Sequence, residues 1–158
     1  MAVSKDEFRT ALSRFASGVT VVTTRDASGH LHGITVSAFC SVSLDPPLIL
    51  VCIERETGSH HAFQEAGRFV VNFLHEGQKD ISNHFASHLD DKFSAVEYQP
   101  GISGLPVLTD SLATLECRLA HSYEGGDHTI FVGEVERTRV KEGNPLLYFH
   151  GNYRRIAD

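Results

Sequence analysis

The side chains of residues 113–123 alternate between two sets, and this alternation constrains the fold more than any other feature. One set is Ala113, Leu115, Cys117, Leu119, His121 and Tyr123, and the other is Thr114, Glu116, Arg118, Ala120 and Ser122. A period of two is typical of a β-strand. The Gly-Gly of 124–127 supplies positive φ for a hairpin turn, so a return strand is expected from His128 to about Val140. With Gly125 and Gly126 as central turn residues, Tyr123 is predicted to face His128.

The rest of the chain reads as further strands with few helices. Ser4 and Glu7 form a capping box for a helix whose face carries Phe8, Leu12 and Phe15, and Gly18 is expected to end it. Strands are expected at 19–24, 34–39, 48–53, 69–74 and 146–149, helices at 59–66 and 78–88, and a loop at 97–107.

Consecutive strands with tight turns favour a mainly β fold with peripheral α-helices, an antiparallel barrel. A parallel Rossmann sheet would need helices between most strands, and Gly-x-Gly-x-x-Gly is absent from the sequence. Repeats, linkers and low-complexity tracts are also absent. We therefore expect one domain over residues 1–158.

Composition limits the partners and the compartment. The 158 residues carry a formal net charge of −6, and the basic residues are scattered, so a nucleic-acid groove is not expected. The longest apolar run is broken by Asp45 and two prolines, so no membrane span is expected. The first residues lack an apolar signal core, and three cysteines without a CxxC argue against a disulfide framework. A cytoplasmic protein is expected.

The run 33–47 changes character halfway. It begins with strand-like alternation, continues with the small hydroxyl residues Ser41 and Ser43 around Val42, and stops at Asp45-Pro46-Pro47. Small side chains let a ligand reach backbone N–H groups, and hydroxyls bond polar ligands. The alternative is a strand that simply ends at a Pro-Pro turn.

A resemblance favours the ligand-binding interpretation. With 15–24 before it and 48–53 after it, the run resembles the short-chain flavin reductase family, and so do 67–74, 126–135 and 148–153, in the family's order. The resemblance spans residues 8–156 and implies a Greek-key split β-barrel of the FMN-binding type, usually a homodimer. It implies an NAD(P)H-dependent flavin reductase that supplies reduced FMN or FAD to a partner monooxygenase. NADH is favoured over NADPH because no obvious basic pocket exists for an extra phosphate.

The same resemblance implies which residues bind flavin. They are expected along the ring and its chain, mainly through small side chains and backbone amides. The set is Thr35, Val36, Ser37, Ala38, Ser41, Val42, Ser43, Cys52 and Ile53, with Phe85 as an aromatic neighbour that equally suits core packing with Ile81.

The phosphate anchor is less defined. Ser59 and His60 lie where a loop enters a short helix, which suits an anion, although Ser59 equally suits a plain N-cap. Many relatives carry a Lys or Arg here, whereas this chain has Arg55 earlier and His60-His61. The anchor therefore stays open.

His128 is the sharpest single candidate. Cross-strand geometry places it on one face with His121, Tyr123 and Ile130. The resemblance implies a catalytic contact of His128 with the nicotinamide, with Tyr153 as a second contact. The alternative is an exposed hairpin histidine bonded to Asp127.

Other interpretations of the sequence fit less well. His84 and His88 have a metal-chelating spacing, but solvent-facing histidines explain them better, so no metal is assigned. Cys40, Cys52 and Cys117 lie in expected strands, which favours inert core thiols. The main alternative function is a non-catalytic flavin- or heme-binding split barrel, and a pyridoxamine-phosphate-type oxidase fits less well because basic phosphate anchors are sparse.

Overall fold

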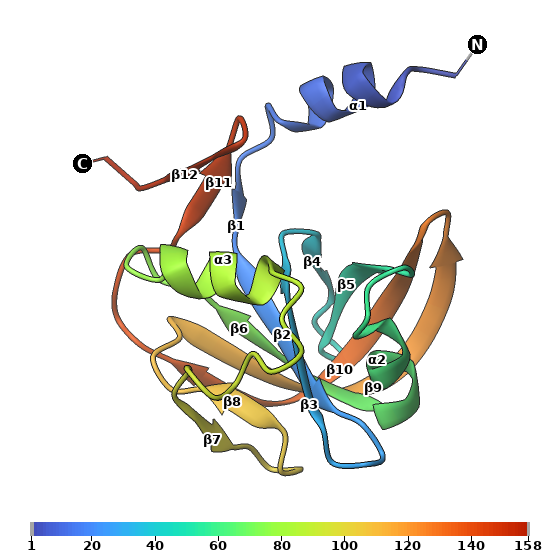
Figure 1. Ribbon diagram of the computed structural model, residues 1–158, viewed down its shortest axis with the longest axis vertical. Helices are drawn as coiled ribbons and strands as arrows, with labels where there is room; N and C mark the ends of the chain where they lie inside the picture. The colour runs from blue at the N-terminus through green and yellow to red at the C-terminus, as the bar shows by residue number, and fades with distance from the viewer. Residues whose placement is uncertain (1, 158) are drawn as a thin grey trace.

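The computed structural model describes residues 2–157 and shows a mainly antiparallel β protein with three short helices (Figure 1). The helices are α1 (Lys5–Leu12), α2 (His60–Ala66) and α3 (Lys79–Ala86). The strands are β1 (Ser17–Gly18), β2 (Thr20–Arg25), β3 (Leu31–Val36), β4 (Phe39–Ser43), β5 (Leu48–Glu54), β6 (Arg68–Phe73), β7 (Tyr98–Pro100), β8 (Pro106–Leu108), β9 (Ala113–Gly125), β10 (His128–Val140), β11 (Leu147–Phe149) and β12 (Asn152–Arg154).

Seven strands form the main sheet in the order β3-β2-β6-β9-β10-β5-β4. All neighbouring pairs in it are antiparallel. The connection from β5 to β6, which carries α2, passes over the two positions that the β9–β10 hairpin fills. This crossing is the Greek-key feature expected from the sequence.

The two edges of this sheet are joined by only two residues. β3 ends at Val36 and β4 begins at Phe39, so three Cα–Cα steps hold the edges within about 11 Å of each other. The sheet must therefore curl until its edges meet, although no ladder joins β3 to β4 among residues 2–157. The result is a barrel with an open seam, which agrees with the expected split barrel, and Ser37-Ala38 bridges that seam.

Two larger apolar clusters fill most of the fold, and a small third one holds Val70, Leu105 and Val107. The barrel interior holds Val22, Val36, Ile49, Val51, Ile53, Phe63, Phe69, Val71, Cys117 and Phe131. A second cluster lies beneath α3 and includes Val21, Leu74, Phe85, Phe93 and Leu146. Phe85 belongs to this cluster and is fully buried, so the core-packing reading of that residue holds, whatever else its ring contacts.

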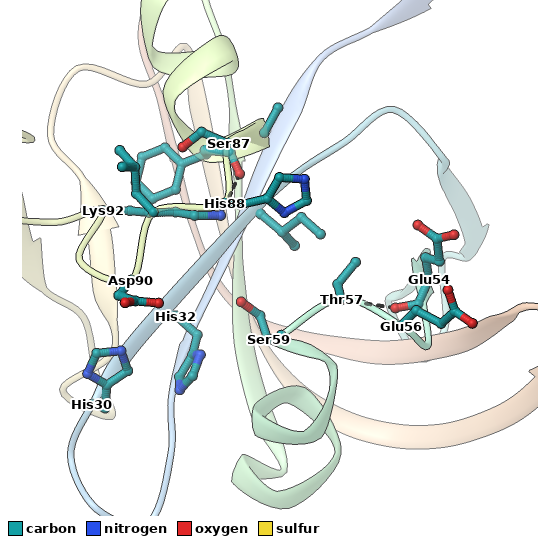
Figure 2. A pocket seen from close by; sticks show the side chains of 15 residues that line it. His30, His32, Glu54, Glu56, Thr57, Ser59, Ser87, His88, Asp90 and Lys92 are labelled. Atoms are coloured by element: carbon teal, nitrogen blue, oxygen red, sulfur yellow. Dashed lines mark hydrogen bonds between the residues drawn. The ribbon is translucent and has the colours of Figure 1, made fainter.

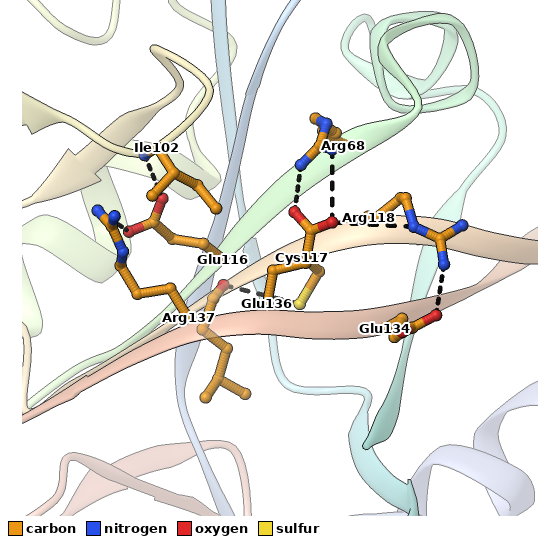
Figure 3. A network of polar contacts seen from close by, with 9 residues as sticks. Arg68, Ile102, Glu116, Cys117, Arg118, Glu134, Glu136 and Arg137 are labelled. Carbon is orange, nitrogen blue, oxygen red and sulfur yellow. Dashed lines mark hydrogen bonds and ion pairs between the residues drawn. The ribbon is translucent and has the colours of Figure 1, made fainter. Parts of the chain in front are cut away.

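The outer face of β6, β9 and β10 carries charged pairs instead of apolar residues (Figure 3). Arg68 pairs with Glu136, and Arg118 pairs with Glu134 at 2.5 Å. Buried Glu116 accepts a hydrogen bond from the Ile102 amide at 2.6 Å, which holds the 101–104 turn against β9. Exposed ion pairs add little stability, so their main effect is to keep this face polar.

The N-terminal helix forms as predicted but ends early. The Ser4–Glu7 capping box is present, with the Glu7 amide donating to Ser4 Oγ at 3.2 Å. The helix stops at Leu12, and the prediction that Gly18 ends it is wrong, because Ser17-Gly18 pairs with β11. Figure 1 shows α1 extending away from the barrel. Phe8, Leu12 and Phe15 are accordingly 54%, 56% and 80% exposed.

Three other predictions need correction. The expected loop at 97–107 contains the short pair β7–β8, because Tyr98 pairs with Leu108. The hairpin turn is centred on Gly126 and Asp127, so His128 faces Gly125 and Tyr123 faces Ile130. Only Gly126 of this turn has positive φ, at 75°, which matches a turn with glycine first. The register differs by two residues, so His121, Tyr123, His128 and Ile130 still share a face.

Among residues 2–157, no helix has both the length and the apolar composition that crossing a membrane requires.

Candidate functional site

A cavity of about 600 Å³ opens between the end of β5, strand β3 and the C-terminal end of α3 (Figure 2). Its volume lies in the range typical of small-molecule and cofactor sites. It is lined by His30, His32, Ile34, Glu54, Glu56, Thr57, Gly58, Ser59, Phe85, Ala86, Ser87, His88, Leu89, Asp90 and Lys92. Two predicted flavin residues, Ser59 and Phe85, therefore line one cavity.

Ser59 occupies the N-cap position of α2, as the sequence suggested. Its side chain makes no capping hydrogen bond within residues 2–157, so Ser59 is the N-cap by position but not through its hydroxyl. The hydroxyl is therefore not committed to the helix. Figure 2 shows Ser59 beneath His88, where the α2 entry faces the segment after α3.

The side chain of His60, the other proposed anchor, forms a hydrogen bond within the fold. Its Nε2 lies 2.8 Å from Thr129 Oγ1 on β10. Burial lowers the pKa of His60, and the positive charges of Arg55 and His61 lower it further. A lowered pKa disfavours the charged imidazolium, which is the form that pairs best with a phosphate.

Lys92 is a cavity residue that sequence reasoning missed. Its Nζ donates to the carbonyls of Phe85 at 2.8 Å and Gly33 at 3.1 Å. Burial lowers the pKa of Lys92. Two of its three N–H groups are committed to these carbonyls, which leaves one for a ligand. Lys92 follows α3 in a loop without a periodic pattern, so no sequence signal indicated it.

The predicted residues around the seam lie beside this cavity and not inside it. The Cys52 amide donates to the Ala38 carbonyl at 3.0 Å, so the seam bridge and β5 are brought together as expected. Ser37 and Ala38 are exposed. Ser37 lines a separate apolar groove of about 330 Å³ with Phe15, Phe39 and Phe73.

Several predicted side chains are already engaged in the fold. Val36 and Ile53 belong to the barrel core, so only their backbone groups remain for a ligand. Thr35 Oγ1 donates to the Ser82 carbonyl at 2.6 Å and ties β3 to α3. On β4, Ser41 and Val42 are exposed and Ser43 is half-buried, with a register shift at Val42.

His128 lies at the tip of the β9–β10 hairpin. Its Nδ1 is 2.7 Å from Asp127 Oδ1, the contact that the alternative reading foresaw. This contact holds the pKa of Asp127 below its usual range. His128 is also paired with Glu54, which lines the cavity, so it stands next to the cavity rim.

Tyr153 stands on the other side of the molecule. Its hydroxyl bonds to Ser82 Oγ at 2.8 Å and Asn83 Oδ1 at 3.0 Å, which holds β12 against α3. Figure 1 places β12 and the β9–β10 tip at opposite sides of the fold. Within one chain, the two residues predicted to contact nicotinamide are not brought together.

The other titratable candidates also differ from expectation. Cys117 is buried, but Cys40 is exposed and Cys52 is half-buried, so the prediction of three core thiols holds for Cys117 alone. His88 lies beyond the end of α3 and His84 Nε2 contacts the Lys92 carbonyl at 2.7 Å, so the two histidines share no helix face and His84 is not solvent-facing.

Comparison with known proteins decides the family. The family model described as flavin reductase like domain matches residues 12–157. The chain belongs to this family. This match confirms the resemblance that the sequence motifs indicated.

Three relatives of the flavin reductase-like chain illustrate the family. A probable flavin reductase of Rhizobium meliloti is 44% identical over 92% of this chain, which spans only 47% of that relative. The reductase component of a 4-nitrophenol 4-monooxygenase/4-nitrocatechol 2-monooxygenase of Rhodococcus opacus is 40% identical over 96% of this chain and 80% of its own length. The NADH:FAD oxidoreductase structure of Streptomyces globisporus, in complex with NAD and FAD fragments, has a TM-score of 0.93, with 36% identity over 99% of this chain and 97% of its own.

These relatives carry in their names the activity that the sequence predicted, and the structural match confirms the fold class.

Proposed function

We propose that this protein is an NADH-dependent flavin reductase that reduces FMN or FAD and supplies the reduced flavin to a monooxygenase. The observation that carries the proposal is the open seam. There, Ser37 and Ala38 are small and exposed, and the Ala38 carbonyl bonds to the Cys52 amide at the edge of a barrel that also holds the 600 Å³ cavity. The activities named for the relatives support the same reaction, with NADH rather than NADPH.

The residues present fit a flavin. Ser37 and Ala38 leave room for a planar ring to approach the seam backbone, and the backbone of residues 41–43 extends that surface along β4. The polar tail would enter the cavity, where the Ser59 hydroxyl and the uncommitted Lys92 N–H would meet ribityl or phosphate oxygens. Bound flavin supplies the hydride acceptor.

The protein must then position the second substrate, the nicotinamide nucleotide. His128, at the cavity rim, would hold the nicotinamide so that the two rings stack closely enough for hydride transfer. Its bond to Asp127 fixes the imidazole orientation. Tyr153 would add its contact from a second protomer, because it lies across the fold from His128 of the same chain.

A homodimer is therefore part of the proposal. The apolar side chains of α1, Phe8 and Leu12, are exposed. Phe15, which follows α1, lines the apolar groove together with Ser37. Covering both with a second copy removes apolar surface from water.

We also propose a cytoplasmic location, because a reducing compartment suits the three free thiols.

Steady-state kinetics under anaerobic conditions tests the proposal. Each of NADH and NADPH is combined with excess FMN or FAD, and nucleotide oxidation is followed. We expect turnover with NADH and either or both flavins, and weaker turnover with NADPH. A tightly bound flavin or heme that neither nucleotide reduces would contradict the proposal and favour a non-catalytic binder.

A further inference from the structure

Three side chains of metal-ligating types meet at one end of β2 and β3, in a cluster that no sequence pattern indicates. Asp26 follows β2, His32 lies in β3 and His61 comes from α2. One ligand atom from each lies within 4.8 Å of the others. The three residues come from separate elements, so only the fold brings them together.

Two of the three donors are held in place. His32 Nε2 is 2.8 Å from Asp26 Oδ2, and their side chains are only 11% and 14% exposed. The other carboxylate oxygen, Oδ1, accepts from the Ser28 amide at 2.9 Å, the Ser28 hydroxyl at 2.6 Å and the His30 amide at 3.0 Å. Such outer contacts orient a ligating carboxylate, and a metal would take the place of the proton that lies between His32 Nε2 and Asp26 Oδ2.

The third donor can complete the site. His61 is exposed on α2, and its ring packs edge-on against His32 with centroids 5.3 Å apart. Zinc bonds of about 2.0–2.1 Å in tetrahedral geometry require donor atoms about 3.3 Å apart. An exposed side chain reaches that spacing by rotation about its own bonds, with no change in the backbone.

The donor set selects a class of metal. Two imidazoles and one carboxylate suit zinc, cobalt, nickel or copper, whereas calcium and magnesium require mostly oxygen ligands. We propose that Asp26, His32 and His61 bind one divalent transition-metal ion, with zinc as the reference, and leave a coordination position for water or another ligand. His32 also lines the 600 Å³ cavity, so the metal would stand at its border. The proposal does not depend on the proposed function.

The alternative is a plain hydrogen-bonded pair of Asp26 and His32, in which His61 takes no part. His61 is therefore the residue that separates the two. Because it is exposed, its replacement leaves the fold intact, whereas changes to Asp26 also disturb the 26–30 turn.

The test titrates the full-length, untagged, chelator-treated protein with Zn²⁺ in competition with a chromophoric chelator. Co²⁺ serves as a second probe, read by its visible absorption. We expect one ion per chain and a Co²⁺ spectrum of tetrahedral type. His61→Ala should weaken zinc binding by at least tenfold, with unchanged circular dichroism.

Matched controls are His88→Ala, which removes a cavity histidine outside the cluster, and His121→Ala, which removes an exposed histidine of β9. Both should bind zinc like the wild type. Stoichiometric zinc binding lost equally in all three variants would overturn the proposal, and so would an affinity that His61→Ala leaves unchanged or the absence of saturable binding.

Discussion

Gly33 leaves the space that the ring of Phe85 fills: a Cβ on Gly33 would lie 2.5 Å from Phe85 Cε1 and 3.2 Å from Phe93 Cζ. Gly33 is on β3 and Phe85 on α3, and Phe85 forms part of the cavity wall. The contact therefore couples the packing of the core beneath α3 to the shape of the proposed flavin site.

Replacing Gly33 with alanine should overpack this contact. We expect a loss of about 1–3 kcal/mol in the free energy of unfolding, measured by urea denaturation, and weaker flavin binding because Phe85 moves into the cavity. Gly58→Ala is the control, since Gly58 lines the same cavity but a Cβ there meets nothing within 4 Å. Equal effects of the two substitutions would contradict the role of the contact.

Enlarging the seam bridge should block flavin. Ser37→Leu or Ala38→Leu places a bulky side chain where the ring would approach the backbone. Flavin affinity, measured by fluorescence quenching, should fall more than tenfold, which is above ~1.4 kcal/mol. Ala95→Leu, at an exposed position on another part of the surface, should bind flavin normally. Unchanged affinity in both seam variants would place the ring elsewhere.

Removing the hairpin histidine should affect one substrate only. His128→Ala should lower kcat/KM for NADH by about one to two orders of magnitude, as expected for one positioned polar contact of ~1.4–2.7 kcal/mol. Flavin affinity should hardly change, because His128 is proposed to contact nicotinamide. His121→Ala, on the same strand face, is the control. Normal NADH kinetics would show that His128 is only a turn residue bonded to Asp127. A loss of flavin affinity that matches the loss of activity would show that His128 contacts the flavin.

Charging the exposed side of α1 should weaken the proposed dimer. Leu12 is 56% exposed in the single chain and is expected to become buried in the dimer. Leu12→Glu would then place a charge in an apolar contact, and light scattering should show dissociation at concentrations where the wild type is dimeric. Thr10→Glu adds the same charge elsewhere on α1. A monomeric wild type at micromolar concentration would refute the dimer itself.

Cys117 should make the fold sensitive to alkali. Burial raises the pKa of this thiol to about 12, and the charges of Glu136 and Glu116 act in the same direction (Figure 3). Between the ordinary value of 9.0 and 12, the unfolded chain releases a proton that the folded chain keeps. Raising the pH through this window therefore favours unfolding, by up to about 1.4 kcal/mol per pH unit.

The measurement compares the free energy of unfolding from pH 8 upward in the wild type and in Cys117→Ala, in about half-unit steps. The wild type should lose stability more steeply above pH 9 than the variant. Cys40→Ala, which removes an exposed thiol, should follow the wild-type curve. Parallel curves for all three proteins would show that Cys117 ionises alike in both states.

Local patterns predicted local structure well. The capping box at Ser4, the Gly67 end of α2 and the β9–β10 hairpin all depend on residues close in sequence, and the structure contains them. The turn register was misplaced because either pair of adjacent residues around Gly126 makes a plausible turn, and only the pairing with the rest of the sheet selects one. The face that carries His128 was nevertheless right, because a two-residue shift preserves the alternation.

The candidate site was only partly predictable. The resemblance pointed to Ser59 and Phe85, which do share a cavity, and to Ala38 with Cys52, which do share a hydrogen bond. It did not reveal Lys92, which reaches its two carbonyls from a loop without periodicity. It also placed His128 and Tyr153 together, whereas one chain holds them apart.

The sequence by itself determined the strand-rich pattern and the caps and turns, because these depend on side chains within a few positions of one another. It also determined the family, because each motif is local and their order along the chain can be read directly. The tertiary structure alone decided that the two sheet edges joined by Ser37-Ala38 flank an open seam, that Lys92 enters the cavity and that Asp26, His32 and His61 meet. These relationships join residues distant along the chain. Their distances are set by how a twisted seven-stranded sheet curls on itself, which no local pattern encodes.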